Sequence, residues 1–296
     1  MQSVISKQPM VALQSAITFL RLCLVKWKQV VCSSVFLVSA GLAGILCFST
    51  AASADGSKYY SVFEILFFKF GRGETEFQSL GYTEILREGL GTYVIMFFPI
   101  FAALPAVLNH CLEYRTEMIR FKLVRKPYRW NLFSDCFGLL MGAGSVAVTG
   151  YLFYAALIRL LFPKGQADRA FLVYFGVKLA CILLFGIVSV IPVLWILPFG
   201  KNEYVTITIP FALFYIQETV TEKFLGGRKG IFGGLWKFNV NLLPDIGWVD
   251  GAAWKFLLFH FLFLVISVWF YVRMQKKRYL ICGTAVRRFD KGEFHE

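Results

Sequence analysis

Long runs of apolar residues, separated by loops rich in charge, are the dominant pattern of this sequence. Six runs approach or exceed the length of a bilayer-spanning helix, and they cover residues 30–52, 92–108, 132–162, 170–198, 204–217 and 254–272. A helix rises about 1.5 Å per residue, so about 20 apolar residues cross a hydrocarbon layer about 30 Å thick. Backbone polar groups in lipid must pair within their own segment, which selects helices. The pattern therefore predicts an all-α, polytopic membrane protein with six transmembrane helices in one domain, residues 1–296.

Two other segments are predicted to lie at the membrane surface. Residues 10–28 carry apolar side chains at helical spacing and basic residues near their end, which predicts an amphipathic interfacial helix. Residues 218–253 are too polar and too rich in glycine for a crossing, and they favour a partly re-entrant external segment between spans five and six. Residues 52–54 resemble a signal-peptidase site, but the preceding basic segment is too long for a signal peptide, and we expect no cleavage.

The distribution of charge predicts the orientation of the chain. Of 31 Lys and Arg residues, 18 fall in segments 1–29, 109–131, 199–203 and 273–296, whereas 10 fall in the remaining loops. Acidic residues are distributed the opposite way, with 6 in the first set and 11 in the second. Because basic loops stay in the cytoplasm, we expect a multi-pass protein of the plasma membrane with both termini inside. The net charge of +13 then faces anionic lipid headgroups of the bilayer rather than nucleic acid.

The sequence lacks the residue patterns that are typical of enzymes. It has three His, and it has no H-E-x-x-H, C-x-x-C or G-x-S-x-G motif. The glycine-rich stretch 226–230 contains a Lys but not the spacing of a phosphate-binding loop. We therefore predict no catalytic, cofactor-binding or metal-binding residues, and we expect that the chain has no nucleotide-binding site of its own.

Lys178, Asp135 and His260 are ionisable residues inside the predicted spans. Lys178 is expected to extend toward the outer headgroups, with a substrate or ion role as the alternative. Asp135 is expected to stay hydrated near the cytoplasm, and His260 to be a hydrogen-bonded residue of the bundle rather than a ligand. A buried proton relay normally needs more ionisable groups than these, so ion-driven transport is not favoured.

The loop between the second and third spans carries the most specific pattern. From Glu113 it reads E-Y-R-T-E-M-I-R-F-K-L-V-R-K-P-Y-R-W, in which charged residues recur three and four positions apart. This spacing predicts a short amphipathic cytoplasmic helix over residues 110–128, an element that is able to transmit force to a soluble partner. A merely solvated loop is equally compatible with the pattern.

This stretch resembles the membrane subunits of type-2 ATP-binding-cassette exporters, in the form found in Gram-positive bacteria. In that family an acidic and basic helix of the kind E-x-x-x-G-x-x-R-F-x-x-x-R is followed by an aromatic residue and a glycine-rich third span. Met118 stands where the family usually has Gly, and Ser134-Asp135 stands in place of Ser-Lys. The residues that match the pattern are Glu113 or Glu117, Arg120, Phe121, Arg125 and Tyr128.

The resemblance implies a permease subunit that exports an amphipathic substrate, such as a peptide, a lipid or a drug-like molecule. It also implies two kinds of partner: a separate ATP-binding-cassette ATPase subunit, which would hold ATP and Mg, and a second permease copy or paralogue. Segment 110–128 would be the coupling helix, with Glu113, Glu117, Arg120 and Arg125 as the ATPase-coupling residues. The alternatives are a non-transporting membrane scaffold or sensor and an ion-driven secondary transporter.

Overall fold

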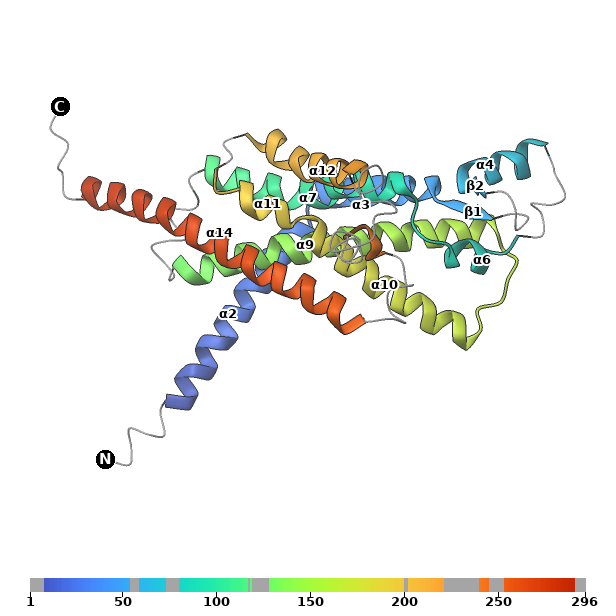
Figure 1. The fold of residues 1–296 in the computed structure, drawn as a ribbon. Coiled ribbons are helices and arrows are strands. Elements are labelled where there is room, and N and C mark those ends of the chain that lie inside the picture. The colour runs from blue at the N-terminus through green and yellow to red at the C-terminus, as the bar shows by residue number, and fades with distance from the viewer. Residues whose placement is uncertain are drawn as a thin grey trace.

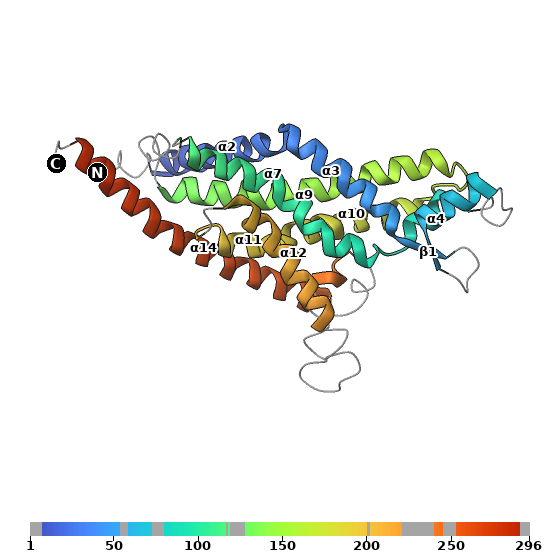
Figure 2. The same ribbon diagram turned by 90° about the horizontal axis from the view of Figure 1, so that it is seen from above.

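The computed structural model describes residues 8–53, 59–72, 80–116, 118, 128–199, 202–220, 240–244 and 253–290. Long helices predominate in these residues, and they lie side by side in one bundle (Figures 1 and 2). The long helices are α2 (Gln8–Val31), α3 (Ser34–Leu46), α7 (Thr92–Arg115), α9 (Tyr128–Leu161), α10 (Arg169–Ser189), α12 (Glu203–Val220) and α14 (Ala253–Asp290). The short elements are η1 (Cys47–Ser49), β1 (Ala51–Ser53), β2 (Tyr59–Ser61), α4 (Val62–Phe67), η2 (Phe68–Arg72), α6 (Tyr82–Arg87), α11 (Ile191–Ile196) and η4 (Val240–Leu242).

Four helical stretches are long and apolar enough to cross a membrane by themselves, which indicates a membrane protein. They are Tyr93–Glu113, Arg129–Leu161, Arg169–Ile196 and Trp254–Lys276, and they coincide with the predicted spans 92–108, 132–162, 170–198 and 254–272. Pro99 and Pro105 lie inside α7, where the sequence places them, and the helix continues past both. The predicted fourth span ends its main helix at Ser189, and Pro192 stands in the first turn of α11. The last helix, α14, runs well beyond the predicted end of its span at residue 272.

The other two predicted spans have a different form. Residues 30–52 do not make one straight helix, because Ala16–Val31 and Ser34–Ser49 meet at a bend of 65°. Ser33 caps α3 at this bend by accepting a hydrogen bond from the backbone of Phe36. The two helices together make at most a fifth, broken crossing. The predicted fifth span, 204–217, lies in α12, whose apolar part Glu203–Ile216 rises only about 20 Å.

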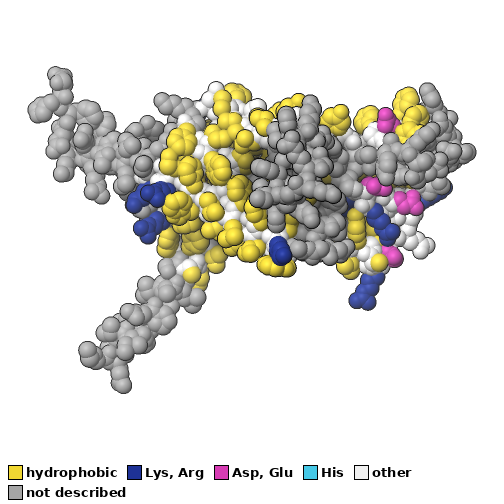
Figure 3. All heavy atoms as spheres, in the orientation of Figure 1, with side chains coloured by type: hydrophobic (Ala, Val, Ile, Leu, Met, Phe, Trp, Pro, Cys, Tyr) yellow, Lys and Arg dark blue, Asp and Glu magenta, His cyan; other side chains and the backbone are white. Residues whose placement is uncertain are grey.

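The two ends of the bundle differ in structure and charge. At one end, which we name the basic end, α2 begins and α14 ends (Figures 1 and 2). At the other, the hairpin end, β1 pairs antiparallel with β2 in the register Ala52 opposite Tyr60, and α4 and α6 follow. The fold class is therefore helical with one small hairpin rather than purely α. Figure 3 shows hydrophobic side chains over the middle of one face and acidic side chains toward the hairpin end.

Helix α4 at the hairpin end carries both buried and exposed apolar side chains. Val62 and Ile65 on α4 are fully buried against the bundle, whereas Phe63 and Phe67 are largely exposed. Ser61 and Glu64 form a reciprocal capping box that fixes the start of this short helix. One face of α4 therefore packs on the helices, and the other presents aromatic rings to the surroundings.

Helix α9 is the centre of the bundle, and it contacts α2, α3, α7, α10 and α14. Its small residues allow these close approaches. A Cβ atom at Gly142 would lie 2.7 Å from the side chain of Val30 on α2, and one at Gly150 would lie 2.9 Å from the backbone oxygen of Ala40 on α3. On the opposite side, Gly144 of α9 and Gly186 of α10 make the second close contact. The glycine-rich pattern of the third span thus serves helix packing.

Candidate functional site

A cluster of charged side chains lies at the basic end, where three helices meet. Lys26 comes from α2, Glu113 from the end of α7, and Asp135 from the beginning of α9. Helix α2 reaches this position because Gly138 of α9 has no side chain: a Cβ there would lie 3.1 Å from Cβ of Lys26. The site is therefore assembled by a close helix contact between segments that are more than 80 residues apart in sequence.

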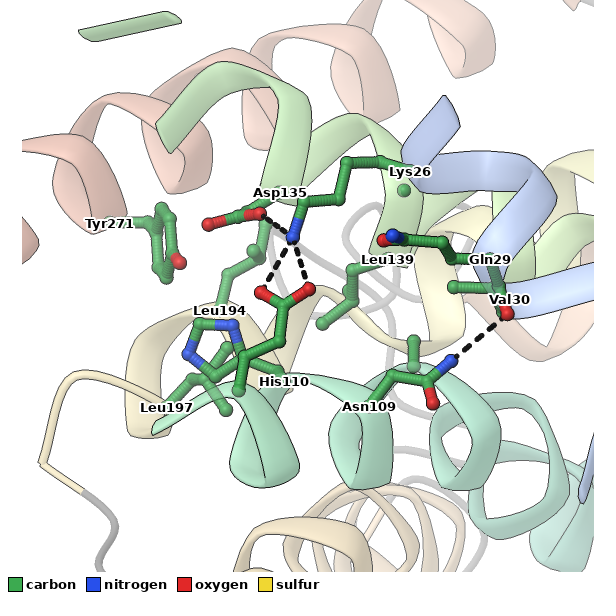
Figure 4. Close-up of a pocket in the computed structure, with 13 residues that line it drawn as sticks. Lys26, Gln29, Val30, Asn109, His110, Asp135, Leu139, Leu194, Leu197 and Tyr271 are labelled. Atoms are coloured by element: carbon green, nitrogen blue, oxygen red, sulfur yellow. Dashed lines mark hydrogen bonds and ion pairs between the residues drawn. The ribbon is translucent and has the colours of Figure 1, made fainter. Parts of the chain in front are cut away.

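The lysine ammonium group stands between the two carboxylates (Figure 4). Lys26 Nζ donates to Glu113 Oε1 at 2.8 Å and to Oε2 at 2.7 Å, and it lies 2.6 Å from Asp135 Oδ1. The side chains retain 15%, 16% and 7% of their exposure, respectively. Ion pairs at this depth are short and charge-assisted, and each partner depends on the others for its solvation.

Two carboxylates face one ammonium group in this cluster. Buried carboxylate oxygens need further polar contacts or water. Beside the cluster is a small cavity of about 30 Å³, which is also lined by Gln29, Asn109, His110 and Tyr271. This volume accommodates one or two water molecules, and the lining offers polar groups that would bind them. The centre is thus an ion-pair cluster with room for solvent, and not an open substrate cavity.

The end of α7 is attached to a third helix by a second ion pair. Arg115 Nη2 lies 2.7 Å from Glu203 Oε2, which is on the first turn of α12. Glu203 retains 10% of its side-chain exposure, whereas Arg115 retains 65%. A carboxylate at this position is also stabilised by the helix N-terminus. Within three residues, α7 is therefore connected through charged side chains to α2, α9 and α12.

Neutral hydrogen bonds support the same junction. Trp27 Nε1 donates to Ser145 Oγ at 2.9 Å, which joins α2 to α9, and Asn109 Nδ2 donates to the backbone oxygen of Gln29 at 3.3 Å, which joins α7 to α2. These bonds lie one turn or less from Lys26 along α2. They fix the helices that carry the three charges, so the charges are pre-positioned by the fold.

The structure gives different outcomes for the four predicted coupling residues. Glu113 lies in the charged cluster and binds Lys26, which is a contact inside the subunit. Glu117, Arg120 and Arg125 lie outside the described residues, as does most of the predicted coupling helix 110–128, although α7 extends to Arg115. The coupling role of all four stays a prediction. The glycine-rich part of the predicted re-entrant segment also lies outside the described residues.

Asp135 is largely enclosed and pairs with Lys26, and it also lines the small cavity, so its hydration stays a prediction. One signal in the sequence pointed to its partner: Lys26 lies one turn before Val30 on the N-terminal helix, and Asp135 lies one turn before Gly138. Pairing them requires knowing that α2 packs on α9, which no local pattern specifies. The contribution of Glu203 was missed for the same reason.

Lys178 marks the opposite end of the bundle. The expectation that it extends to the outer headgroups is wrong, because Lys178 is only 1% exposed and its ammonium group donates to the backbone oxygens of Leu86 and Glu88 at the hairpin end. Tyr174 donates to the oxygen of Arg87 at 2.5 Å. The last carbonyls of α6 are therefore bound by α10, which is a structural role.

The described part of the chain contains no group of three or more His, Cys, Asp or Glu residues placed to hold a metal ion. Comparisons with protein-family models, with curated proteins and with solved structures found no match. The described residues of the site supply a cation shared between two carboxylates, which connects α2, α7 and α9.

Proposed function

We propose that this chain is the membrane subunit of an ATP-driven exporter of the type that the loop after α7 resembles. In this arrangement the chain crosses the plasma membrane six times, with the basic end and both termini in the cytoplasm and residues 218–253 partly re-entrant on the outside. A separate ATPase subunit binds ATP and Mg and docks on segment 110–128. A second copy of the permease, or a paralogue, completes the complex.

The observation that carries this proposal is the set of charged contacts at the end of α7. Glu113 and Arg115 connect the beginning of the coupling segment to α2, α9 and α12. A force applied to the coupling segment would act on α2 and α9 through the buried Lys26 cluster, where separating an ion from its partners costs about 3–5 kcal/mol. It would act more weakly on α12, because Arg115 in the pair with Glu203 is exposed. The bundle would therefore change its packing as a unit instead of bending at one loop.

Nucleotide binding at the ATPase shifts the permease from one arrangement of its helices to another only if the two arrangements bind the ATPase with different affinity. The ion cluster supplies a two-state element of this kind, since Lys26 has two carboxylates that come from different helices. A small displacement of α7 relative to α9 would favour one carboxylate over the other. Motion at the basic end is then passed along α9, which is in contact with most of the bundle.

The test is reconstitution of the purified complex in lipid vesicles. The double variant Glu117→Gln/Arg120→Gln should insert normally and lose most of the stimulation of ATP hydrolysis by the permease. The matched control, Glu88→Gln/Lys164→Gln, also removes one acidic and one basic side chain, but at the hairpin end, and should leave the stimulation unchanged. Full stimulation in the first variant would refute the assignment of segment 110–128.

One observation favours a second candidate, the ion-driven transporter. Ionisable residues buried among apolar helices commonly mark ion pathways, and the Lys26 cluster has a water-sized cavity beside it. In the same vesicles, transport driven by an ion gradient without nucleotide would support this candidate. Transport that needs ATP supports the exporter, and the absence of both transport and a co-purifying ATPase supports the scaffold or sensor.

A further inference from the structure

Helix α14 lies along the outside of the bundle, with one face packed on it and the other open (Figures 1 and 2). In the span Trp254–Lys276, 22% of the most apolar stretch is buried, compared with 44–56% in the other three spans. The packed face carries His260, Ser267 and Tyr271, which are all buried. These residues are seven and four positions apart, so they share one side of the helix.

The open face of α14 changes along its length from apolar to basic. Leu262, Ile266 and Trp269 follow one another at four- and three-residue spacing, and each is more than half exposed. The same spacing continues to Arg273 and to the exposed Lys276. One side of the helix therefore presents an apolar stripe, then a tryptophan, then two basic side chains toward the basic end.

The stripe has the length of one membrane leaflet. Leu262 and Arg273 are eleven positions apart, which corresponds to about 16 Å along the helix axis. Half of the hydrocarbon layer is about 15 Å thick. Tryptophan rings favour the boundary between hydrocarbon and headgroups, where Trp269 would lie. With Leu262 near the middle of the bilayer, Arg273 and Lys276 reach the level of the lipid phosphates.

The two basic side chains are available to a ligand. The guanidinium carbon of Arg273 lies 5.2 Å from the ring centroid of Trp269, which supports the group from one side. A guanidinium group held over a ring keeps its N–H groups free to donate to phosphate. Within the described part of the chain, neither Arg273 nor Lys276 forms an ion pair with a carboxylate.

A second exposed tryptophan borders this face. Trp195 of α11 contacts Phe263 and Phe270 of α14, with ring centroids 5.7 and 6.3 Å apart, and it is 42% exposed. Phe263 and Phe270 follow directly after Leu262 and Trp269, so the indole of Trp195 stands at the edge of the stripe. Two exposed indole rings beside basic residues are typical of a headgroup boundary.

We propose that this face of α14 binds an anionic phospholipid of the leaflet at the basic end. The phosphate accepts hydrogen bonds from Arg273 and Lys276, and one acyl chain lies along Leu262 and Ile266. A zwitterionic lipid binds less tightly, because its own cation faces the two basic side chains. A water-soluble acidic partner would not cover a stripe at the depth of the hydrocarbon. The inference needs α14 to cross the membrane, but it does not need the exporter assignment.

Binding is tested on the intact purified chain in phosphatidylcholine nanodiscs, without ATPase or nucleotide. The probes are phosphatidylglycerol and phosphatidylcholine that carry the same diazirine-bearing acyl chain, each added in trace amount. After illumination, mass spectrometry locates the labelled peptides. Phosphatidylglycerol should label residues 258–276 about tenfold more than phosphatidylcholine, since each basic side chain near the headgroups changes the affinity about fivefold. Equal labelling by the two probes would overturn the proposal.

A pair of matched variants separates this site from the overall charge of the chain. Arg273→Gln/Lys276→Gln should remove most of the preference for phosphatidylglycerol at α14. The control Arg21→Gln/Lys28→Gln removes two exposed basic side chains from α2, and it should change the preference at α14 by less than about twofold. Equal reductions in the two variants would show that only the total charge matters, and the proposal would then be wrong.

Two measurements on the parent chain need no variant. Labelling of α14 by phosphatidylglycerol should decrease as the salt concentration rises, because exposed charges are screened, whereas labelling by phosphatidylcholine should not. A preference that does not depend on salt would contradict the role of the basic side chains. If both probes fail to label residues 258–276 and a short cross-linker joins these residues to a second copy, the face is an interface between copies, which would also overturn the proposal.

Discussion

Removing Lys26 should destabilise the protein more than removing either of its partners. In Lys26→Met, Glu113 and Asp135 lose their shared cation and remain near each other. Each carboxylate has an oxygen within about 3 Å of the same nitrogen, so these oxygens are at most about 6 Å apart. Two like charges about 5 Å apart repel by about 3 kcal/mol at an effective dielectric constant of about 20. The total loss expected for an uncompensated buried charge is about 3–5 kcal/mol.

Asp135→Asn should have a smaller effect, because it leaves one Lys and one Glu as a neutral pair. Loss of one charge-assisted bond predicts about 1–3 kcal/mol. The triple variant Lys26→Met/Glu113→Gln/Asp135→Asn removes every charge, and it should recover much of the stability lost in Lys26→Met. The exposed Lys28, on the same helix, provides the control: Lys28→Met should change the free energy of unfolding by less than about 0.5 kcal/mol.

The measurement is unfolding of the purified chain in mixed micelles with increasing dodecyl sulfate, followed by tryptophan fluorescence. The order of stability, rather than any single value, decides the question. The reasoning is refuted if Lys26→Met and Asp135→Asn destabilise equally, or if the triple variant is less stable than Lys26→Met. Either result would mean that the two carboxylates do not depend on the lysine.

Two more outcomes follow from packing and from the hairpin end. Gly142→Ala should destabilise the bundle by about 1–3 kcal/mol, because the new methyl group would overlap α2. The control Gly176→Ala, whose new methyl group meets nothing within 4 Å, should be neutral or slightly stabilising. Unfolding in micelles compares the two variants, and equal losses of stability would contradict the close helix contact. Lys178→Met should leave the carbonyls at the end of α6 without their donor, which costs about 1–3 kcal/mol of stability. The same variant should exchange its amide hydrogens faster in residues 80–90. Unchanged exchange in these residues would argue against the bond.

The sequence predicted the parts of the fold that depend on local composition. Hydrophobic length identified the four long spans, since the bilayer sets a minimum number of apolar residues. Glycine spacing in residues 138–150 predicted close helix packing, and Gly142 and Gly150 do contact α2 and α3. The same approach misjudged residues 30–52, because composition does not reveal a 65° bend or a strand that begins at Ala51.

The charged centre was beyond such reasoning. Glu113 was singled out as a coupling residue and Asp135 as a hydrated one, yet the structure places both on Lys26. Which charges pair depends on which helix faces meet, and that is settled by contacts between segments far apart in the chain. His260 differs, since its bond to the backbone oxygen of Phe256 lies within its own helix and agrees with the hydrogen-bonded residue that the sequence predicts.

The amino-acid sequence by itself therefore determined that the chain is a helical membrane protein and where its long helices run. Only the tertiary structure decided which helices approach closely, and that α7 ends in a junction of ion pairs that also involves α2, α9 and α12. The physical reason is range: burial in lipid acts on each segment separately, whereas ion pairs and cavities are made between segments.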